Sequence, residues 1–252
     1  MERREKVVHE DTEPCPYLPG EVARLPLRWQ LRPLNAEELD RSLALGERRV
    51  GRMLYRPTCP TCRACEPLRV PVREFQPTKS QRRVLRKNED LRVEIGPATF
   101  SEERLHLYNR HKQERGLGRD ERLMTRRGYE GWFIQSCTPT VEMRYYAADR
   151  LIGLGILDVG AEDASSVYFY FDPDESKRSL GVFSVMAEIH WMRSRGGRYH
   201  YLGLYVAACS HLVYKASYYP HERLIGDRWH RVEEAPLGAR TPAALPDPVS
   251  PD

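Results

Sequence analysis

The sequence has 252 residues, of which 40% are hydrophobic, and a formal net charge of +4. This length suits one large domain or two small ones, with enough apolar residues for a buried core. No run of 18 apolar residues occurs, and the charged N-terminal segment has no apolar stretch typical of an export signal. We therefore expect a soluble, cytoplasmic protein without a membrane partner, whose six cysteines are reduced thiols or metal ligands.

The positive charge is concentrated in one stretch. Residues 48–92 contain 13 Lys and Arg against 4 Asp and Glu, so this stretch carries +9 and the rest of the chain −5. Such a stretch is either an ordinary solvated surface or an anion-binding surface, for which RNA phosphates are the expected ligand. Five basic residues within it recur at helical spacings and can share one side of a helix: Lys79, Arg82, Arg83, Arg86 and Lys87.

The first part of the chain predicts few long elements. We expect residues 1–14 to form a charged, mobile arm. Asn35 and Glu38 have the spacing of a capping box, which predicts a helix that Gly46 ends. Residues 57–78 contain five prolines and three closely spaced cysteines, which favours loop and short strand.

Two helices are expected in the middle of the chain. Ser101 can cap a helix that runs to about Arg115, where Gly116 and Gly118 interrupt it. A second helix is expected over residues 129–136.

The second half of the chain alternates strands and helices. We expect strands over 141–147, 151–159, 166–171, 199–206 and near Leu224, and helices over 180–195 and 210–216. The long helix should bury a stripe formed by Val182, Val185, Met186, Ile189 and Met192.

This order predicts an α+β fold with a mixed sheet, which resembles the GNAT-like acyltransferase fold. The chain would comprise a charged flexible arm (1–14), a smaller basic, cysteine-containing α/β domain (15–100), a GNAT-like transferase domain (101–234) and a disordered proline-rich tail (235–252).

Two neighbouring features could form a site. Strict alternation along 166–171 places Tyr168, Tyr170 and Asp172 on one face, opposite Val167, Phe169 and Phe171. The following turn contains Arg178, Ser179 and Gly181 at a helix N-terminus, where backbone N–H groups attract anions and Arg178 adds positive charge. The alternative is that the tyrosines are packing residues and that Asp172 begins the turn before Pro173.

The cysteines form a closely spaced group. Cys59, Cys62 and Cys65 have the spacing C-x2-C-x2-C, and Cys15 is a possible fourth ligand. One C-x2-C is typical of zinc sites, whereas the overlapping pair is closer to an iron–sulfur pattern. Leu68 stands where that pattern expects its fourth cysteine. The group is therefore either a zinc or iron–sulfur site or a set of reduced thiols.

Four segments together resemble one protein family. They are CPYLP (15–19), YRPTCPTCRAC (55–65), PTKSQRR (77–83) and FDPD with SLG (171–174 and 179–181). Their order and spacing resemble the aminoacyl-tRNA–protein transferases, in particular the compact bacterial aspartate/glutamate leucyltransferases. The related eukaryotic branch contains the arginyl-tRNA–protein transferases. The resemblance covers roughly residues 14–232.

The resemblance implies transfer of an amino acid, with leucine favoured and arginine as the other option, from charged tRNA to the N-terminal Asp or Glu of a protein. Such transfer tags proteins for degradation as N-degrons. The implied partners are charged tRNA and proteins with an acidic N-terminal residue, not DNA. The donor ester is already activated, and the acceptor amine has a pKa of about 7.7–8.0, so the chemistry requires no cofactor.

The predicted roles follow from this reaction. Tyr168 or Tyr170 would place the ester, and Asp172 would orient or deprotonate the amine. Lys215, next to Tyr214, would pair with the acidic side chain of the acceptor, with help from an arginine that the sequence does not identify. The tRNA would contact Lys79, Arg82, Arg83, Arg178, Ser179 and Gly181.

Two other functions remain open at this point. An N-acetyltransferase that uses acetyl-CoA would explain residues 141–232 but not the cysteines or the basic segment. A non-catalytic RNA- or metal-binding protein would explain residues 48–92 but not the strand–turn–helix unit.

Overall fold

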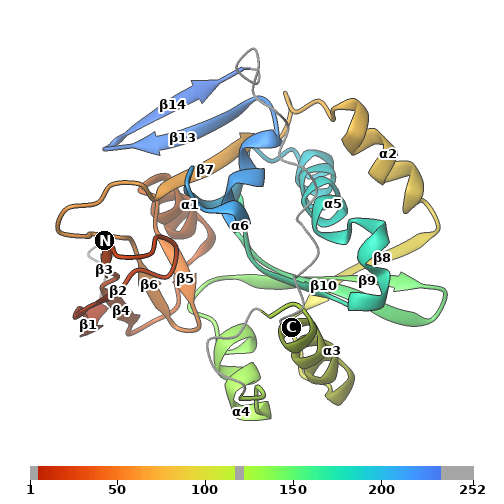
Figure 1. Cartoon of the computed structure of the whole chain (residues 1–252), viewed down its shortest axis with the longest axis horizontal. Coiled ribbons are helices and arrows are strands. Elements are labelled where there is room, and N and C mark those ends of the chain that lie inside the picture. Colours follow the sequence, from red (N-terminus) through yellow and green to blue (C-terminus); the bar gives the residue numbers. More distant parts are fainter. Residues whose placement is uncertain (1–4, 117–121, 234–252) are drawn as a thin grey trace.

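The computed structural model describes residues 5–116 and 122–233. A large sheet with helices on both faces forms the centre, and smaller strands lie beside it (Figure 1). The expectations for residues 1–4, for Gly118 and for the tail from residue 235 lie outside the described residues. Within the described residues, no helix combines the length and the apolar character needed to cross a membrane.

The large sheet has eight strands in the order β14-β13-β7-β12-β11-β10-β9-β8. Only β11 and β12 are parallel neighbours, so the sheet is mixed, which confirms the α+β prediction. The strands are β7 (Glu66–Pro71), β8 (Leu91–Pro97), β9 (Thr140–Ala147), β10 (Arg150–Val159), β11 (Ala164–Phe171), β12 (Tyr199–Tyr205), β13 (His221–Ile225) and β14 (Arg228–Val232).

Two of these strands come from the expected N-terminal domain. β7 lies between β12 and β13, and β8 pairs with β9 at the edge. The predicted division at residue 100 therefore does not separate two sheets. The reason is non-local: Leu68 in β7 pairs with Gly203 in β12, and no pattern within residues 57–78 specifies so distant a partner.

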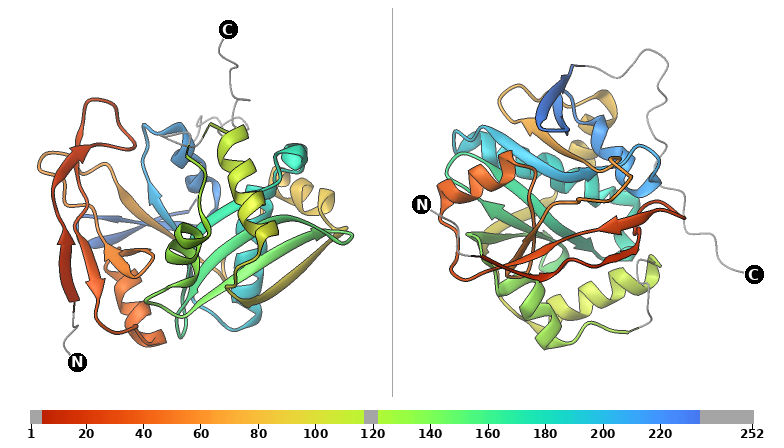
Figure 2. Two further views of the ribbon diagram at one scale, coloured as in Figure 1. Left: turned by 90° about the horizontal axis from the view of Figure 1, so that it is seen from below. Right: turned by 90° about the vertical axis from the view of Figure 1, so that its left-hand side faces the viewer.

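Helices cover both faces of the large sheet (Figures 1 and 2). On one face lie α5 (Leu180–Ser194) and α2 (Lys79–Lys87), which pack on β7, β12 and the hairpin β9–β10. On the other face lie α3 (Glu102–Glu114), α4 (Arg126–Tyr129) and the π-helical turn η1 (Glu130–Ile134). The predicted stripe of α5 is in the core, with Val182 half-buried and the other four residues buried.

The helix boundaries mostly agree with the sequence. Asn35 and Glu38 form the predicted capping box of α1 (Ala36–Ala44), and Ser101 caps α3. The helix expected over 129–136 is instead α4 followed by η1, because Thr125 caps the backbone N–H of Gly128 and begins the helix earlier.

Most of the described part of the N-terminal segment forms β-strands, so the prediction of a mobile arm is wrong there. β1 (Glu5–His9) pairs with β4 (Leu27–Gln30) in a second sheet of order β1-β4-β6-β5, with β6 at Met53–Tyr55 and β5 at Arg48–Val50. β2 (Thr12–Pro14) and β3 (Val22–Arg24) form a separate hairpin. Figure 2 shows these red and orange strands beside the large sheet.

A buried ion pair connects the two sheets. Arg49 in β5 donates from Nε to both carboxylate oxygens of Asp158 in β10, at 2.9 and 2.8 Å. The two side chains are only 1% and 3% exposed. Because removing one partner of such a pair leaves an uncompensated buried charge, this contact fixes β5 against the large sheet.

Candidate active site

Strands β11 and β12 separate soon after they begin. Ala164 pairs with His200 and Ser165 with Tyr201, and the described residues contain no further pairing between the two strands. Beyond these pairs the strands diverge towards their carboxyl ends. We call this divergence the strand opening. The carboxyl ends of diverging strands are a common place for ligands.

Two cations lie at the strand opening. Arg48 in β5 donates a hydrogen bond of 2.6 Å to the carbonyl of Ser166 in β11. Lys215, in the short helix η3 (Tyr214–Ser217) that follows α6 (Ser210–Val213), donates from Nζ to the carbonyl of Leu204 in β12 at 2.9 Å. One cation is thus bound to each of the separating strands.

Gly203 brings the two cations together. It adopts a φ of +88°, which favours glycine, at the point where the pairing of β12 with β7 shifts register. A Cβ placed on Gly203 would lie 3.0 Å from the Arg48 guanidinium and 3.4 Å from Lys215 Nζ. A side chain at this position would therefore occupy the space beside both cations.

No carboxylate in the described part of the chain balances the charge of the two cations. Neither Arg48 nor Lys215 forms an ion pair with a carboxylate among residues 5–116 and 122–233. Burial of the amino group, together with the positive charge of Arg48, lowers the pKa of Lys215 to about 7. The neighbouring Tyr214 is half-buried, and burial raises its pKa to about 12. The sequence selected Lys215 and Tyr214, and the arginine beside Lys215 is Arg48.

The predicted tyrosine face is part of the hydrophobic core. Tyr170 is fully buried, its hydroxyl lies 2.6 Å from that of Tyr129, and burial raises its pKa well above the ordinary value. Tyr168 is half-buried against Tyr108 in the same cluster. Val167 also contacts this cluster, because a register shift in β11 interrupts the expected alternation. Packing therefore explains Tyr170 better than contact with a substrate.

Asp172 is engaged by other groups of the protein. It is 4% exposed and forms ion pairs with Arg110, at 3.1 Å, and with Arg150. It also accepts a hydrogen bond from the backbone N–H of Asp174, which caps the turn η2 (Pro173–Arg178). These contacts fit a residue that fixes the end of β11, whereas a general base needs a carboxylate open to the substrate.

A buried polar network lies on the α5 side of the strand opening. Glu188 accepts hydrogen bonds from Ser184 at 2.7 Å and from Ser166 at 2.5 Å, and lies 2.8 Å from Nε2 of His200. Nδ1 of His200 has no partner in the described residues. This network was not predicted from the sequence, although a glutamate within the apolar stripe of α5 was a usable signal.

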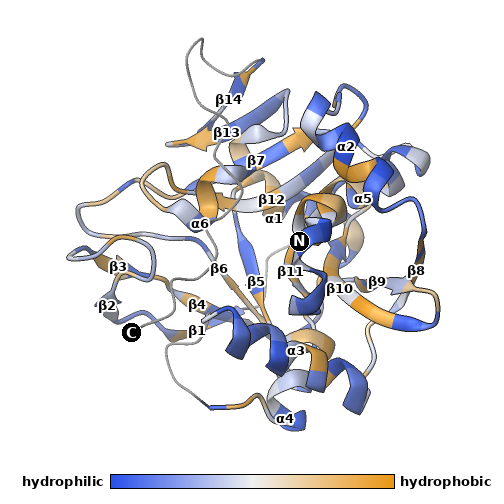
Figure 3. Ribbon diagram, turned by 45° about the vertical axis from the view of Figure 1, so that its right-hand side comes forward, coloured by the Kyte–Doolittle hydropathy of each residue, from blue (hydrophilic) through white to orange (hydrophobic). Residues whose placement is uncertain are grey.

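The predicted tRNA-binding residues lie on two neighbouring elements, α2 and the turn before α5. Lys79, Arg82 and Arg83 are exposed on α2, which is mostly hydrophilic in Figure 3. The end of α2 contacts the turn before α5, because the Asn88 side chain donates to the carbonyl of Arg178 at 2.9 Å.

The backbone of the turn before α5 is accessible, but the charge of its arginine is already paired. Ser179 is exposed with a φ of +56°, and a Cβ on Gly181 would meet no atom within 4 Å. Arg178, in contrast, forms ion pairs with Asp90 and Glu175, so its charge is already balanced. Among the predicted residues, the positive charge available to a phosphate therefore comes from α2.

The four predicted ligand cysteines are neighbours. Burial and the nearby thiols of Cys59, Cys15 and Cys62 raise the pKa of Cys65 to about 12. A bound metal would act in the opposite direction, because it stabilises the thiolate. The backbone N–H groups of Tyr17 and Ala64 donate to the sulfurs of Cys15 and Cys62 at 3.5 Å.

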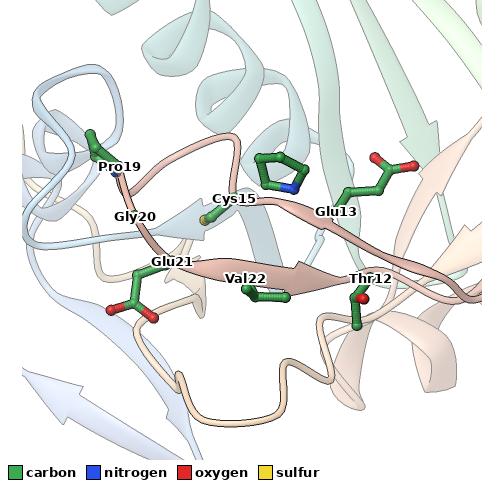
Figure 4. Close-up of a pocket in the computed structure, with 8 residues that line it drawn as sticks. Thr12, Glu13, Cys15, Pro19, Gly20, Glu21 and Val22 are labelled. Carbon is green, nitrogen blue, oxygen red and sulfur yellow. The ribbon is translucent and has the colours of Figure 1, made fainter.

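These contacts fit thiolate ligands, whose sulfurs accept such hydrogen bonds. The described residues nevertheless contain no group of three His, Cys, Asp or Glu side chains arranged to hold a metal ion. Cys15 also borders a pocket at the β2–β3 hairpin, together with Pro19, Gly20 and Glu21 (Figure 4).

The strand opening, its paired cations and the basic helix are consistent with an acyl transferase that takes its donor from RNA. Two family models match the chain: "Arginine-tRNA-protein transferase, N terminus" over residues 13–83 and "Arginine-tRNA-protein transferase, C terminus" over residues 103–225. The chain belongs to the aminoacyl-tRNA–protein transferase family and is an aminoacyltransferase. The two alternative functions each accounted for only one half of the chain, whereas this family accounts for both.

Relatives that are more than 30% identical in sequence agree with this assignment. An aspartate/glutamate leucyltransferase of Saccharophagus degradans is 38% identical over 73% of this chain and 78% of its own length. One of Aeromonas salmonicida is 34% identical over 88% of this chain and 93% of its own length. A solved fungal structure described as a GCN5-related glucosamine N-acetyltransferase region covers 56% of this chain and 18% of its own, with 13% identity and a TM-score of 0.34.

Replacing Tyr170 tests the assignment of this residue to the core. Tyr170→Phe should change the rate of aminoacyl transfer by less than about threefold and lower the free energy of unfolding by about 1–3 kcal/mol, because Tyr129 loses a buried hydrogen-bond partner. Tyr129→Phe is the matched variant and should behave alike. Transfer kinetics and chemical denaturation measure the two effects. If the rate of transfer falls by about a hundredfold or more while stability is unchanged, Tyr170 has a catalytic role and its assignment to the core alone is wrong.

Proposed function

We propose that this enzyme transfers leucine from leucyl-tRNA to proteins whose N-terminal residue is Asp or Glu. Such transfer would tag these proteins for degradation as N-degrons, in the cytoplasm. The similarity to relatives named aspartate/glutamate leucyltransferases supports the choice of donor and acceptor. The observation that carries the acceptor preference is the pair Arg48 and Lys215, two neighbouring cations at the strand opening without a carboxylate among the described residues.

An acidic side chain complements this pair. A carboxylate that enters the strand opening would find hydrogen-bond donors on both sides, and charge-assisted hydrogen bonds are about twice as strong as neutral ones. A neutral side chain of similar size would leave these donors unpaired, which costs about 1–3 kcal/mol. The site therefore favours acceptors that begin with Asp or Glu.

The binding of leucine needs apolar walls. Val167 and Phe169 of β11 and Leu204 of β12 are apolar side chains on the two strands of the opening. Phe169 packs with Tyr145 on the α5 side and Leu204 is buried in β12, while Val167 contacts the cluster on the opposite face. Phe169 and Leu204 thus remain candidates for the leucyl pocket, and Val167 does not.

The tRNA is proposed to lie along α2 and the turn before α5. Lys79, Arg82 and Arg83 would contact the phosphate backbone, and the open backbone at Ser179 and Gly181 would allow close approach. This arrangement would direct the aminoacylated end towards the strand opening, since the same turn begins α5 beside β11.

We also propose that Cys15, Cys59, Cys62 and Cys65 hold zinc or an iron–sulfur cluster. The neighbouring thiols and the two N–H···S hydrogen bonds support this proposal. Such a group would stabilise the N-terminal half by joining the β2–β3 hairpin to the segment before β7, and the transfer chemistry would not require it.

A transfer assay with individually charged tRNAs tests the substrates. Leucine should be transferred to peptides beginning with Asp or Glu at least about fivefold faster than to peptides beginning with Asn or Gln, because only a carboxylate pairs with both cations. The amide peptides are the matched control, as they have the same size and no charge. If arginyl-tRNA competes successfully against leucyl-tRNA, the donor assignment is wrong. Equal rates with the amide peptides would contradict the acceptor assignment.

Charge reversal on α2 tests the binding of tRNA. The triple variant Lys79→Glu, Arg82→Glu and Arg83→Glu should weaken tRNA binding and reduce the slope of log affinity against log salt by about one for each phosphate that the variant no longer neutralises. Filter binding at several salt concentrations gives this slope. Lys6→Glu, on exposed β1, is the control and should leave it unchanged. An unaltered slope in the triple variant would place the tRNA elsewhere.

Metal analysis tests the cysteine proposal. Protein purified without oxygen should contain zinc, or iron with sulfide, at about one site per chain, and Cys62→Ser should lower both this content and the melting temperature. Cys137→Ser is the control, because Cys137 is buried away from the group and should leave the metal content unchanged. If the purified protein contains no metal and is fully active, the alternative that these four cysteines are reduced thiols is favoured.

A further inference from the structure

The proposed reaction needs a group that removes a proton from the acceptor. The α-amine attacks the ester only as the neutral amine, and its pKa of about 7.7–8.0 leaves most of it protonated at neutral pH. Two carboxylates on the elements that border the strand opening are unsuited to this role. Asp172 is held by Arg110 and Arg150, and both oxygens of the buried Glu188 accept hydrogen bonds from serine hydroxyls.

We propose that Lys215 is the catalytic base. Its neutral amine takes a proton from the α-ammonium group of the acceptor, and the ammonium that results then pairs with the acidic side chain of the same acceptor residue. This inference rests on the proposed function and adds the step that joins acceptor recognition to catalysis. Lys215 thereby acts first as a base and then as the cation that the carboxylate requires.

The position of Lys215 suits both roles. Its Nζ donates one hydrogen bond, to the carbonyl of Leu204, and no other bond to it is found among the described residues. A neutral amine in this position keeps its lone pair free for a proton. Lys215 is half-buried as a residue, so the strand opening can admit a substrate, while its amino group is enclosed enough to lose much of its hydration.

The surroundings hold Lys215 in the form that a base requires. Burial is the largest cause of its lowered pKa of about 7, and the charge of Arg48 from β5 acts in the same direction. Cys209, in the loop after β12, acts weakly in the opposite direction. Tyr214, the preceding residue, has a raised pKa and is uncharged at neutral pH. A substantial fraction of Lys215 is therefore neutral near pH 7.

The step balances in atoms and charge. One N–H bond of the α-ammonium breaks as one N–H bond forms on Nζ, so the total charge of enzyme and peptide is unchanged. The free amine attacks the ester carbon, forming the C–N bond, and the C–O bond to the terminal ribose of the tRNA breaks. The proton lost by the attacking nitrogen passes to that ribose oxygen. Lys215 releases its own proton to water after the product leaves.

Titration of Lys215 tests the inference without any transfer assay. Lysines labelled with carbon-13 at Cε should give one resonance that titrates near pH 7, and this resonance should be absent from Lys215→Arg. Arg48→Met should move this titration to higher pH because it removes a positive neighbour, whereas Arg48→Lys should leave it in place. Titration of Lys215 only in the ordinary range of exposed lysines, about pH 10, would overturn the inference.

The dependence of transfer on pH tests the catalytic role. For wild-type enzyme with saturating leucyl-tRNA and an Asp-initiated peptide, kcat/KM should rise through about pH 7. Lys215→Arg retains a cation but cannot act as a base, so kcat at pH 7 should fall at least about a hundredfold, with KM for the peptide changed far less. Lys6→Arg is the control, as an exposed lysine on β1.

The possible outcomes separate the two proposals. If wild-type enzyme transfers no leucine to Asp peptides, the proposed function fails, and the titration of Lys215 still decides its protonation state. If transfer occurs and Lys215→Arg keeps the wild-type rate and pH profile, Lys215 is a fixed cation and the inference is wrong. If Lys215→Arg does not fold, Lys215→Ala is assayed with added alkylamines of different pKa. A rescued rate that follows the concentration of the neutral amine supports the base, and a rescued rate that follows the ammonium form, or no rescue, overturns it.

Discussion

The separation of β11 from β12 is the constraint on which the site depends. Parallel strands that part after two pairs leave backbone carbonyls without sheet partners, and an unsatisfied buried polar group costs about 1–3 kcal/mol. Arg48 satisfies the carbonyl of Ser166 on one strand, and Lys215 satisfies that of Leu204 on the other. The two groups that stabilise the diverging backbone are thus the same two that we propose supply positive charge to the substrate. The stability of the strand opening and the proposed function therefore depend on the same side chains.

This arrangement requires both halves of the chain. Arg48 belongs to β5 of the small sheet, and the adjacent Arg49 fixes that strand through its buried pair with Asp158. Successive residues of a strand point in opposite directions, so one arginine can fix β5 against β10 while the other reaches β11. The small sheet is therefore a component of the candidate active site. The participation of β7 and β8 in the large sheet leads to the same conclusion.

The parts of the structure that were predictable are those set by local sequence. The capping box at Asn35, the hairpin β9–β10 and the helix α5 follow from patterns within a few residues of one another, and all three were predicted. The place of β7 between β12 and β13 depends on partners more than a hundred residues away, which periodicity does not encode.

The candidate site was predictable to a smaller extent. Lys215 was selected through the family resemblance, but its partner Arg48 was one of 13 basic residues in its stretch, and only the fold distinguishes it. Tyr170 illustrates the opposite error. Alternation assigns a side chain to a face of a strand, but it does not reveal whether a helix covers that face, as α3 does here.

The proposed base also determines at which step an acidic acceptor would be favoured. While Lys215 is neutral, a peptide with a neutral first side chain meets one cation, Arg48, and binding carries little electrostatic penalty. Once the proton has moved to Lys215, two neighbouring cations face the same space, and only a carboxylate there compensates them. An uncompensated group costs about 1–3 kcal/mol, which corresponds to about 5- to 150-fold in rate. Since this cost arises after binding, discrimination should be expressed in kcat more than in KM, as expected for an enzyme that is complementary to its transition state.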